Sequence, residues 1–69
     1  MSSKLRITRI LKHTSQYALA IISGVFQPRI SLIENDLAKP TEEEMKKLAK
    51  SLGVKVEYIF PTEEANHDD

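Results

Sequence analysis

The segment 15–40, SQYALAIISGVFQPRISLIENDLAKP, limits most strongly what this chain can fold into. A serine at its start is a good cap for a helix over about 16–22, and Gly24 supplies the conformational freedom that a sharp turn needs. Pro28 is compatible only with the first turn of a helix, which places the next helix over about 27–35. The segment therefore predicts two short helices joined by a tight turn, followed by a loop.

A further helix is predicted before this segment. Leu5, Ile10 and Leu11 recur at helical spacing, with Ile7 as a less regular member. Basic residues lie between them, so the pattern indicates an amphipathic helix over about 3–13.

Two more helices are predicted after the segment. Thr41 and Glu44 have the spacing of a capping box, and the apolar stripe that follows them ends at Gly53. A short last helix over about 56–60 precedes Pro61, which cannot continue it. The chain thus contains five predicted helices.

The length of 69 residues leaves room for one small core, which we expect in an all-α domain over 3–61. The sequence of 62–69, TEEANHDD, has nothing to bury and is expected to be a disordered acidic tail. There is no cysteine, the apolar runs are too short to span a bilayer, and MSSKLRITR lacks the apolar stretch of a signal peptide. We therefore expect a soluble cytoplasmic domain.

The formal net charge is zero, but the charges are unevenly distributed. Residues 1–41 carry six Lys and Arg against two acids, whereas residues 42–69 carry four against eight. Such asymmetry favours a surface that faces a polyanion in the first part of the chain. Because the whole chain is not strongly basic, the affinity from counterion release is expected to be modest.

No arrangement of residues typical of catalysis or metal binding is visible. His13 and His67 are far apart and have no neighbouring cluster of acids or cysteines at ligand spacing. Gly24 and Gly53 are the only glycines, which leaves no phosphate-binding loop. We expect a protein without enzymatic activity, metal or other cofactor, and without a small-molecule ligand.

One family has a similar order of residues. A Ser-Gln pair opens the helix at 16, Leu-Ala marks its buried face, a Gly turn follows, and Ile30 and Ile33-Glu34-Asn35 end the next helix. This order resembles the helix-turn-helix of the lambda-repressor/Cro-like (xenobiotic-response-element type) family of DNA-binding regulators, and the resemblance runs from residue 5 to residue 61. It implies a compact five-helix domain with the helix-turn-helix at helices 2 and 3, and a recognition helix at about 27–35 in the major groove.

The residues that face outward from the recognition helix are candidate base readers. At about 100° per residue, Ile30 and Ile33 point into the core while the opposite side and its flanks remain available. Gln can pair with adenine, Arg with guanine or a phosphate, and an apolar side chain with a thymine methyl. The candidates for base contacts, which the resemblance also implies, are Gln27, Pro28, Arg29, Ser31 and Leu32.

A second set of residues is expected to contact the DNA backbone. The resemblance implies that Gln16 touches a phosphate and braces Gln27. The candidates for phosphate contacts are Ser15 through its backbone, Gln16, Asn35 and Lys39, with Arg6 or Lys12 as outer basic residues.

Arg9 and Glu34 align with an Arg–Glu pair that, in some repressors of this type, joins the first helix to the third. The helical projection agrees, because Glu34 lies about 70° from the centre of the buried face, where an acid needs a partner. We expect an Arg9–Glu34 salt bridge.

Four residues depart from the family pattern. Phe26 stands where Ser or Thr usually caps the recognition helix, so this helix begins either at Gln27 or one residue later, with Gln27 as its cap. Asp36 stands where Gly is usual. Ile21 and Ile22 replace residues that are usually polar and make the preceding helix apolar nearly all round.

Two interpretations of this apolar helix stay open. In one, Ile22 packs against the first helix and Ile21 is a lone exposed apolar residue. In the other, Tyr17 and Ile21, with or without Phe26, form a patch that contacts a partner protein.

The expected function is sequence-specific binding of double-stranded DNA by a transcriptional regulator, a repressor or a small controller-type protein. A single domain buries too little surface to be specific alone, so we expect a homodimer on a palindromic site. The candidate dimer interface is Tyr58, Ile59 and Phe60, which leaves the recognition helix free. The alternative is a protein-interaction module on the same scaffold, an antitoxin-like or anti-regulator subunit with weak DNA binding.

Overall fold

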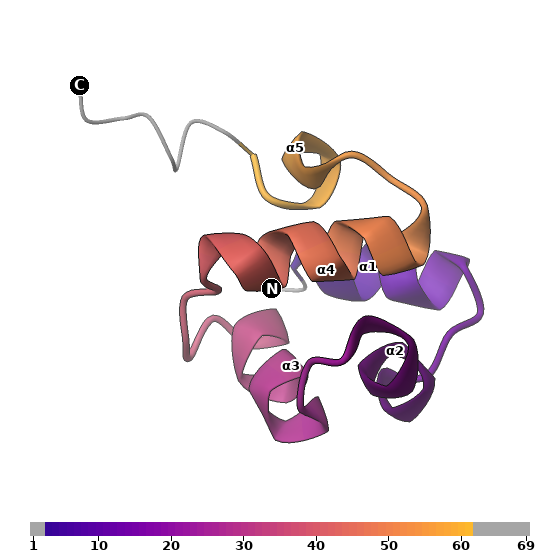
Figure 1. Ribbon diagram of the computed structural model, residues 1–69, viewed down its shortest axis with the longest axis horizontal. Coiled ribbons are helices and arrows are strands. Elements are labelled where there is room, and N and C mark those ends of the chain that lie inside the picture. Colours follow the sequence, from indigo (N-terminus) through magenta and orange to yellow (C-terminus); the bar gives the residue numbers. More distant parts are fainter. Residues whose placement is uncertain (1–2, 62–69) are drawn as a thin grey trace.

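The computed structural model describes residues 3–61, which form helices and no strand (Figure 1). The all-α prediction is confirmed. The tail expected over 62–69 lies outside the described residues. The five helices are α1 Lys4–Leu11, α2 Gln16–Ser23, α3 Gln27–Glu34, α4 Glu42–Leu52 and α5 Val56–Ile59.

The helices enclose one apolar core. α4 crosses the middle of the domain, with α5 on one side of it and α2 and α3 on the other, and it packs against both α2 and α5 (Figure 1). α1 packs against α3 and α5. Burial of each large apolar side chain in the core contributes about 1.5–3 kcal/mol. The core consists of Leu5, Leu19, Val25, Ile30, Ile33, Leu48, Ala49, Leu52 and Ile59.

The buried face of α1 differs from the apolar pattern of its sequence. Leu5 is buried, but Ile10 and Leu11 are 51% and 69% exposed. The buried face continues instead with Thr8 and Arg9, which lie on the same side of the helix as Leu5. The reason is the buried carboxylate of Glu34 on α3, which attracts the Arg9 side chain into the interior. With Arg9 on the buried side of α1, Ile10 and Leu11 face outward.

Side-chain caps fix the starts of three helices. The hydroxyls of Ser3, Ser15 and Thr41 accept hydrogen bonds from backbone N–H groups in the first turns of α1, α2 and α4. The predicted capping box of α4 is confirmed, since the Glu44 carboxylate also accepts from the Thr41 backbone N–H. α3 begins at Gln27, with no side-chain cap from the residue before it, so the later start with Gln27 as cap is wrong.

Three helices end on the same backbone motif. His13, Asp36 and Gly53 follow α1, α3 and α4 with φ of 55°, 60° and 71°. In each case the next backbone N–H reaches a carbonyl five residues back, as in a Schellman motif. Gly24 ends α2 with φ of 80°. The sequence around His13 contains no glycine, and therefore the end of α1 could not be located from it.

Candidate nucleic-acid interface

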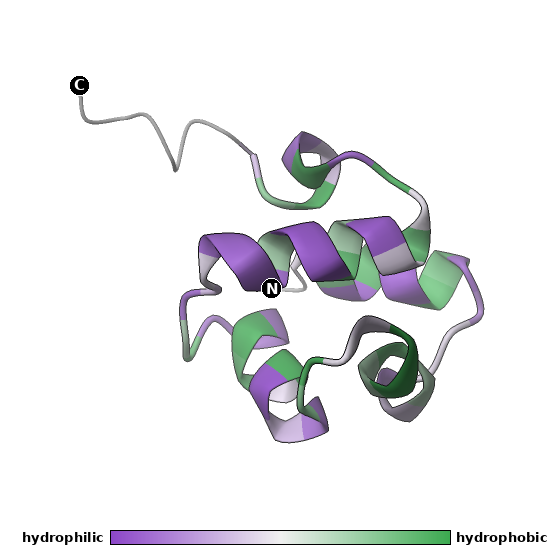
Figure 2. Ribbon diagram, viewed as in Figure 1, coloured by the Kyte–Doolittle hydropathy of each residue, from purple (hydrophilic) through white to green (hydrophobic). Residues whose placement is uncertain are grey.

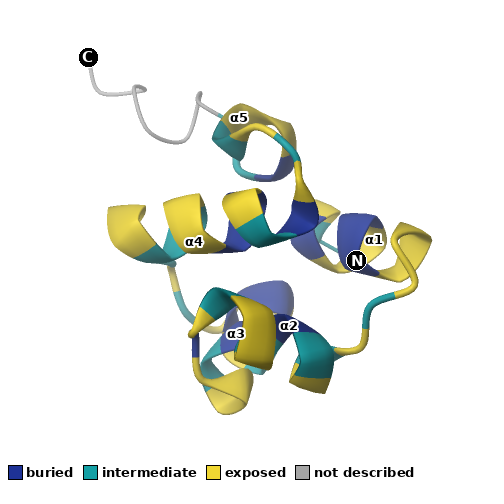
Figure 3. Ribbon diagram, turned by 45° about the vertical axis from the view of Figure 1, so that its right-hand side comes forward, coloured by how far each residue is buried: buried dark blue, intermediate teal, exposed yellow. Residues whose placement is uncertain are grey.

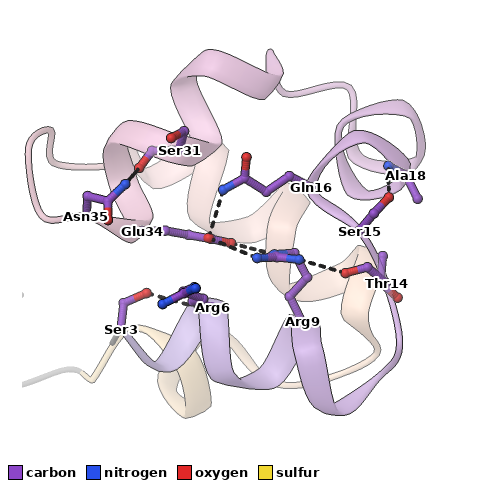
Figure 4. A network of polar contacts seen from close by, with 10 residues as sticks. All are labelled: Ser3, Arg6, Arg9, Thr14, Ser15, Gln16, Ala18, Ser31, Glu34 and Asn35. Atoms are coloured by element: carbon purple, nitrogen blue, oxygen red, sulfur yellow. Dashed lines mark hydrogen bonds and ion pairs between the residues drawn. The ribbon is translucent and has the colours of Figure 1, made fainter. Parts of the chain in front are cut away.

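A buried polar network joins the first three helices (Figure 4). Arg9 of α1 donates from Nε to Glu34 Oε2 at 2.7 Å and from Nη2 to Glu34 Oε1 at 3.2 Å. Gln16, the first residue of α2, donates from Nε2 to Glu34 Oε1 at 3.0 Å. Arg9 Nη1 also donates to the Thr14 carbonyl, in the loop between α1 and α2, at 2.9 Å.

This network satisfies a carboxylate that would otherwise be costly to bury. The Glu34 side chain is 1% exposed, and its bidentate contact with a guanidinium has the strongest geometry available to an ion pair in proteins. Among residues 3–61, no buried side-chain nitrogen or oxygen lacks a hydrogen-bond partner. The salt bridge expected between Arg9 and Glu34 is present, and it fixes α3 relative to α1 and to the start of α2.

Gln16 was expected to brace Gln27, but the hydrogen bond that the structure gives it goes to Glu34. The physical reason is the buried carboxylate of Glu34. Its Oε1 accepts one hydrogen bond from the Arg9 guanidinium and a second from the neutral amide of Gln16. Gln16 therefore connects the start of α2 to the network, which sequence reasoning did not anticipate.

The outward side of α3 carries polar and apolar residues but no unpaired charge of its own. Ile30, Ile33 and Glu34 are buried, as the projection requires. Among the candidate base readers, Gln27, Pro28 and Leu32 are exposed and Ser31 is partly exposed. Figure 3 shows exposed and intermediate stretches along α3.

Arg29, the remaining candidate base reader, is held against α4. Its Nε and Nη2 donate to Glu44 Oε2 and Oε1 at 2.8 and 3.0 Å, and Nη2 also donates to the Lys39 carbonyl at 2.9 Å. The hydrogen bonds from Arg29 hold the pKa of the Glu44 carboxyl below its ordinary value, and the same contact raises the pKa of Arg29. The sequence did not reveal this partner, although Glu44 was recognised as part of the capping box.

The candidate phosphate contacts lie at the edges of the helix-turn-helix. The Ser15 hydroxyl caps α2, and the Asn35 side chain donates from Nδ2 to the Ser31 carbonyl at 2.9 Å. Lys39 lies exposed in the loop between α3 and α4, and its carbonyl receives the hydrogen bond from Arg29. The outer basic residues Arg6 and Lys12 are also exposed.

α2 and the turn after it expose a group of large apolar side chains. Tyr17 and Ile21 are each 65% exposed and Phe26 is 80% exposed. Ile22 is 62% exposed, so the interpretation in which it packs against the first helix is wrong. α2 is coloured as hydrophobic over most of its length in Figure 2. Leu19 is the one residue of α2 that is fully buried, and the helix packs against α4 and α3.

The candidate dimer residues separate into different environments. Ile59 is 3% exposed and belongs to the core, so it cannot form an intermolecular contact while the domain remains folded. Its burial follows from the single turn of α5, which packs on α4 and α1. Tyr58 is exposed, with Lys4 Nζ 5.8 Å from the ring centroid, and Phe60 is partly buried against the core.

Within residues 3–61, no helix is both long and apolar enough to cross a membrane. The same part of the chain contains no group of three or more side chains suited to hold a metal ion.

Five helices around one core, with α2 and α3 joined by a left-handed glycine, define a helix-turn-helix domain. A family model described as "Helix-turn-helix" matches residues 5–59. The chain therefore belongs to the lambda-repressor/Cro-like helix-turn-helix family of DNA-binding regulators. Comparisons with curated proteins and with solved structures gave no match.

Proposed function

We propose that this protein is a sequence-specific, double-stranded-DNA-binding transcriptional regulator of the repressor or controller type, acting in the cytoplasm. The observation that carries the proposal is the buried network of Arg9, Gln16 and Glu34. It holds α3 in a fixed position against α1 and α2, and it leaves the outward residues of α3 available to a DNA groove. Preorganisation of this kind lowers the cost of ordering the reading side chains on binding.

The chemistry of the outward side of α3 suits A·T-containing sequence. Gln27, at the first position of the helix, can pair bidentately with adenine, and Leu32 can contact a thymine methyl. Ser31 can hydrogen-bond to a base of either type, and Pro28 shapes the approach to the groove. Backbone contacts would come from Ser15, Gln16, Asn35 and Lys39, as the resemblance implies.

We further propose a homodimer, because one domain of this size buries less DNA surface than specific recognition needs. Tyr58 and Phe60 remain the candidate dimer residues after the exclusion of Ile59. A dimer formed at α5 leaves α3 of each copy free, with half-sites about 34 Å apart on a palindromic operator.

The experiment is a titration of fluorescent duplex DNA with purified protein at 50 and 200 mM salt. The proposal predicts binding that weakens steeply with salt, since phosphate contacts release counterions. Lys39→Ala should reduce the slope of log K against log salt by about 0.9. Lys55→Ala, a matched loss of one exposed charge next to α5, should leave the slope unchanged. No binding at 50 mM salt contradicts the proposal.

A second candidate is a protein-interaction module with weak DNA binding. The observation that favours it is the exposed apolar group of Tyr17, Ile21 and Phe26 beside a recognition helix that presents no unpaired cation. Tyr17→Ser and Ile21→Ser should then abolish co-purification of a protein partner. If these substitutions instead leave co-purification unchanged while DNA binding persists, the regulator is favoured.

A further inference from the structure

Arg29 is the only basic residue in the sequence of α3, and its hydrogen-bonding capacity is largely committed. A guanidinium has five N–H donors, and three of them are used here. Nε and Nη2 form a side-on fork with the Glu44 carboxylate, and the second N–H of Nη2 goes to the Lys39 carbonyl.

This arrangement determines what Arg29 can offer to DNA. A bidentate contact with guanine or with a phosphate needs two N–H groups on one side of the guanidinium. The side-on fork consists of Nε and Nη2, and the end-on fork consists of Nη1 and Nη2. Both include Nη2, both of whose hydrogens are already donated. While the contact with Glu44 persists, Arg29 cannot form either fork with a base.

Glu44 is itself held in place from the other side. Its Oε1 accepts the Thr41 backbone N–H at 2.8 Å as part of the capping box, so the carboxylate is fixed at the start of α4. The pair lies at the surface, with the Arg29 and Glu44 side chains 32% and 20% exposed. A pair with this exposure is partly screened by solvent.

We propose that Glu44 is a specificity-determining residue that withholds Arg29 from DNA. By engaging the one cation of α3, it leaves recognition to the uncharged residues and keeps both affinity for arbitrary duplexes and preference for guanine low. The inference rests on the proposed function, since it concerns the same recognition helix. It differs from that proposal in assigning a role to a residue of α4, outside the helix-turn-helix.

The test compares Glu44→Gln with Glu43→Gln by titration of a labelled random-sequence duplex. Both substitutions remove one charge from the first turn of α4, but Glu43 pairs with Lys47 on the same helix, at 3.3 Å and with its own side chain 77% exposed. Gln at residue 44 can still form the capping box, so the fold is retained, and the helical circular dichroism of each variant verifies this.

Glu44→Gln is expected to bind the random duplex several-fold more tightly than Glu43→Gln at 50 mM salt. Its slope of log K against log salt should be steeper by about 0.9 per protomer, so that the advantage shrinks about 3.5-fold per protomer between 50 and 200 mM. Adding Arg29→Ala to Glu44→Gln should cancel the gain. Sequence selection with Glu44→Gln should also reveal a new guanine preference in each half-site.

The outcomes separate the two proposals. If the wild-type chain binds DNA and Glu44→Gln behaves like Glu43→Gln, the inference about Glu44 is wrong while the proposed function stands. If none of the proteins binds duplex DNA at 50 mM salt, both are wrong. A gain that Arg29→Ala fails to cancel also overturns the inference, because the gain would then not depend on Arg29.

Discussion

Arg9 and Glu34 are 25 residues apart in sequence, yet they form a bidentate ion pair of 2.7 and 3.2 Å inside the domain. The pair joins α1 to α3, and Gln16 adds α2 to the same carboxylate. The orientation of α3 thus depends on polar contacts as well as on the apolar core. Such contacts are directional, and they can fix an angle that apolar packing alone leaves loosely defined.

Replacement of Glu34 by Gln should destabilise the fold strongly. The substitution leaves the Arg9 charge nine-tenths buried without its counter-charge, and removal of one partner of a buried pair costs about 3 kcal/mol or more. Urea unfolding followed by circular dichroism measures the loss. Glu43→Gln, which neutralises an exposed acid, is the control and should change the free energy of unfolding by less than about 0.5 kcal/mol. Equal stability of the two variants would show that the pair contributes nothing.

The contact between Arg29 and Glu44 should make stability depend on acid pH. Hydrogen bonds from Arg29 lower the pKa of Glu44 in the folded state below its ordinary value of 4.5. A lowered folded pKa gives stabilisation that is complete above the unfolded pKa and is lost as pH falls through the folded value. The difference in unfolding free energy between the wild-type chain and Glu44→Gln should therefore shrink as pH falls from 6 to 3. A difference that grows or stays constant over this range would rule out the assigned linkage.

His13→Gly should stabilise the protein. His13 adopts φ of 55° at the end of α1, a conformation that costs an L-residue more than it costs glycine. After subtraction of the greater chain entropy of glycine, the expected gain is roughly 0.5 kcal/mol. Gly53→Ala tests the same motif in the opposite direction, and no atom beyond the two neighbouring residues lies within 4 Å of the added Cβ, so its loss of stability reports backbone strain. Thermal unfolding of the two variants should give shifts of opposite sign.

Phe26→Ser should also stabilise the domain. Phe26 occupies the N-cap of α3, makes no side-chain cap hydrogen bond and is 80% exposed. A serine hydroxyl there can accept from a backbone N–H of the first turn, which contributes about 1 kcal/mol. Chemical denaturation provides the measurement, with Phe26→Ala as the control that removes the ring without adding a cap. If both variants are equally stable, the first turn of α3 gains nothing from a side-chain cap.

The arrangement of helices could be predicted largely from local signals in the sequence. Caps at Ser15 and Thr41, the turn at Gly24 and the position of Pro28 each act within a few residues, so they define helix ends without knowledge of the tertiary structure. The exception is the end of α1, because a histidine takes the left-handed conformation usually assigned to glycine.

Contacts between distant side chains were harder to predict. The Arg9–Glu34 pair was accessible because a buried acid at a known helical angle demands a cation, and the family resemblance named one. The pair of Arg29 and Glu44 was not, since both residues already had a satisfactory explanation as base reader and capping residue. The exposure of Ile10 and Leu11 on α1 was missed for a related reason. Periodicity alone does not say that the side of a helix with a charged residue such as Arg9 will be the buried one.

The central claim, that α3 reads DNA sequence, is tested most directly by selection of duplexes from a random pool with the purified protein. The wild-type chain should enrich a palindrome with half-sites about 34 Å apart. Gln27→Ala should lose the preference for adenine at one position of each half-site while keeping its affinity for random DNA. Failure to enrich any sequence, or an enriched site that Gln27→Ala leaves unchanged, would contradict the account.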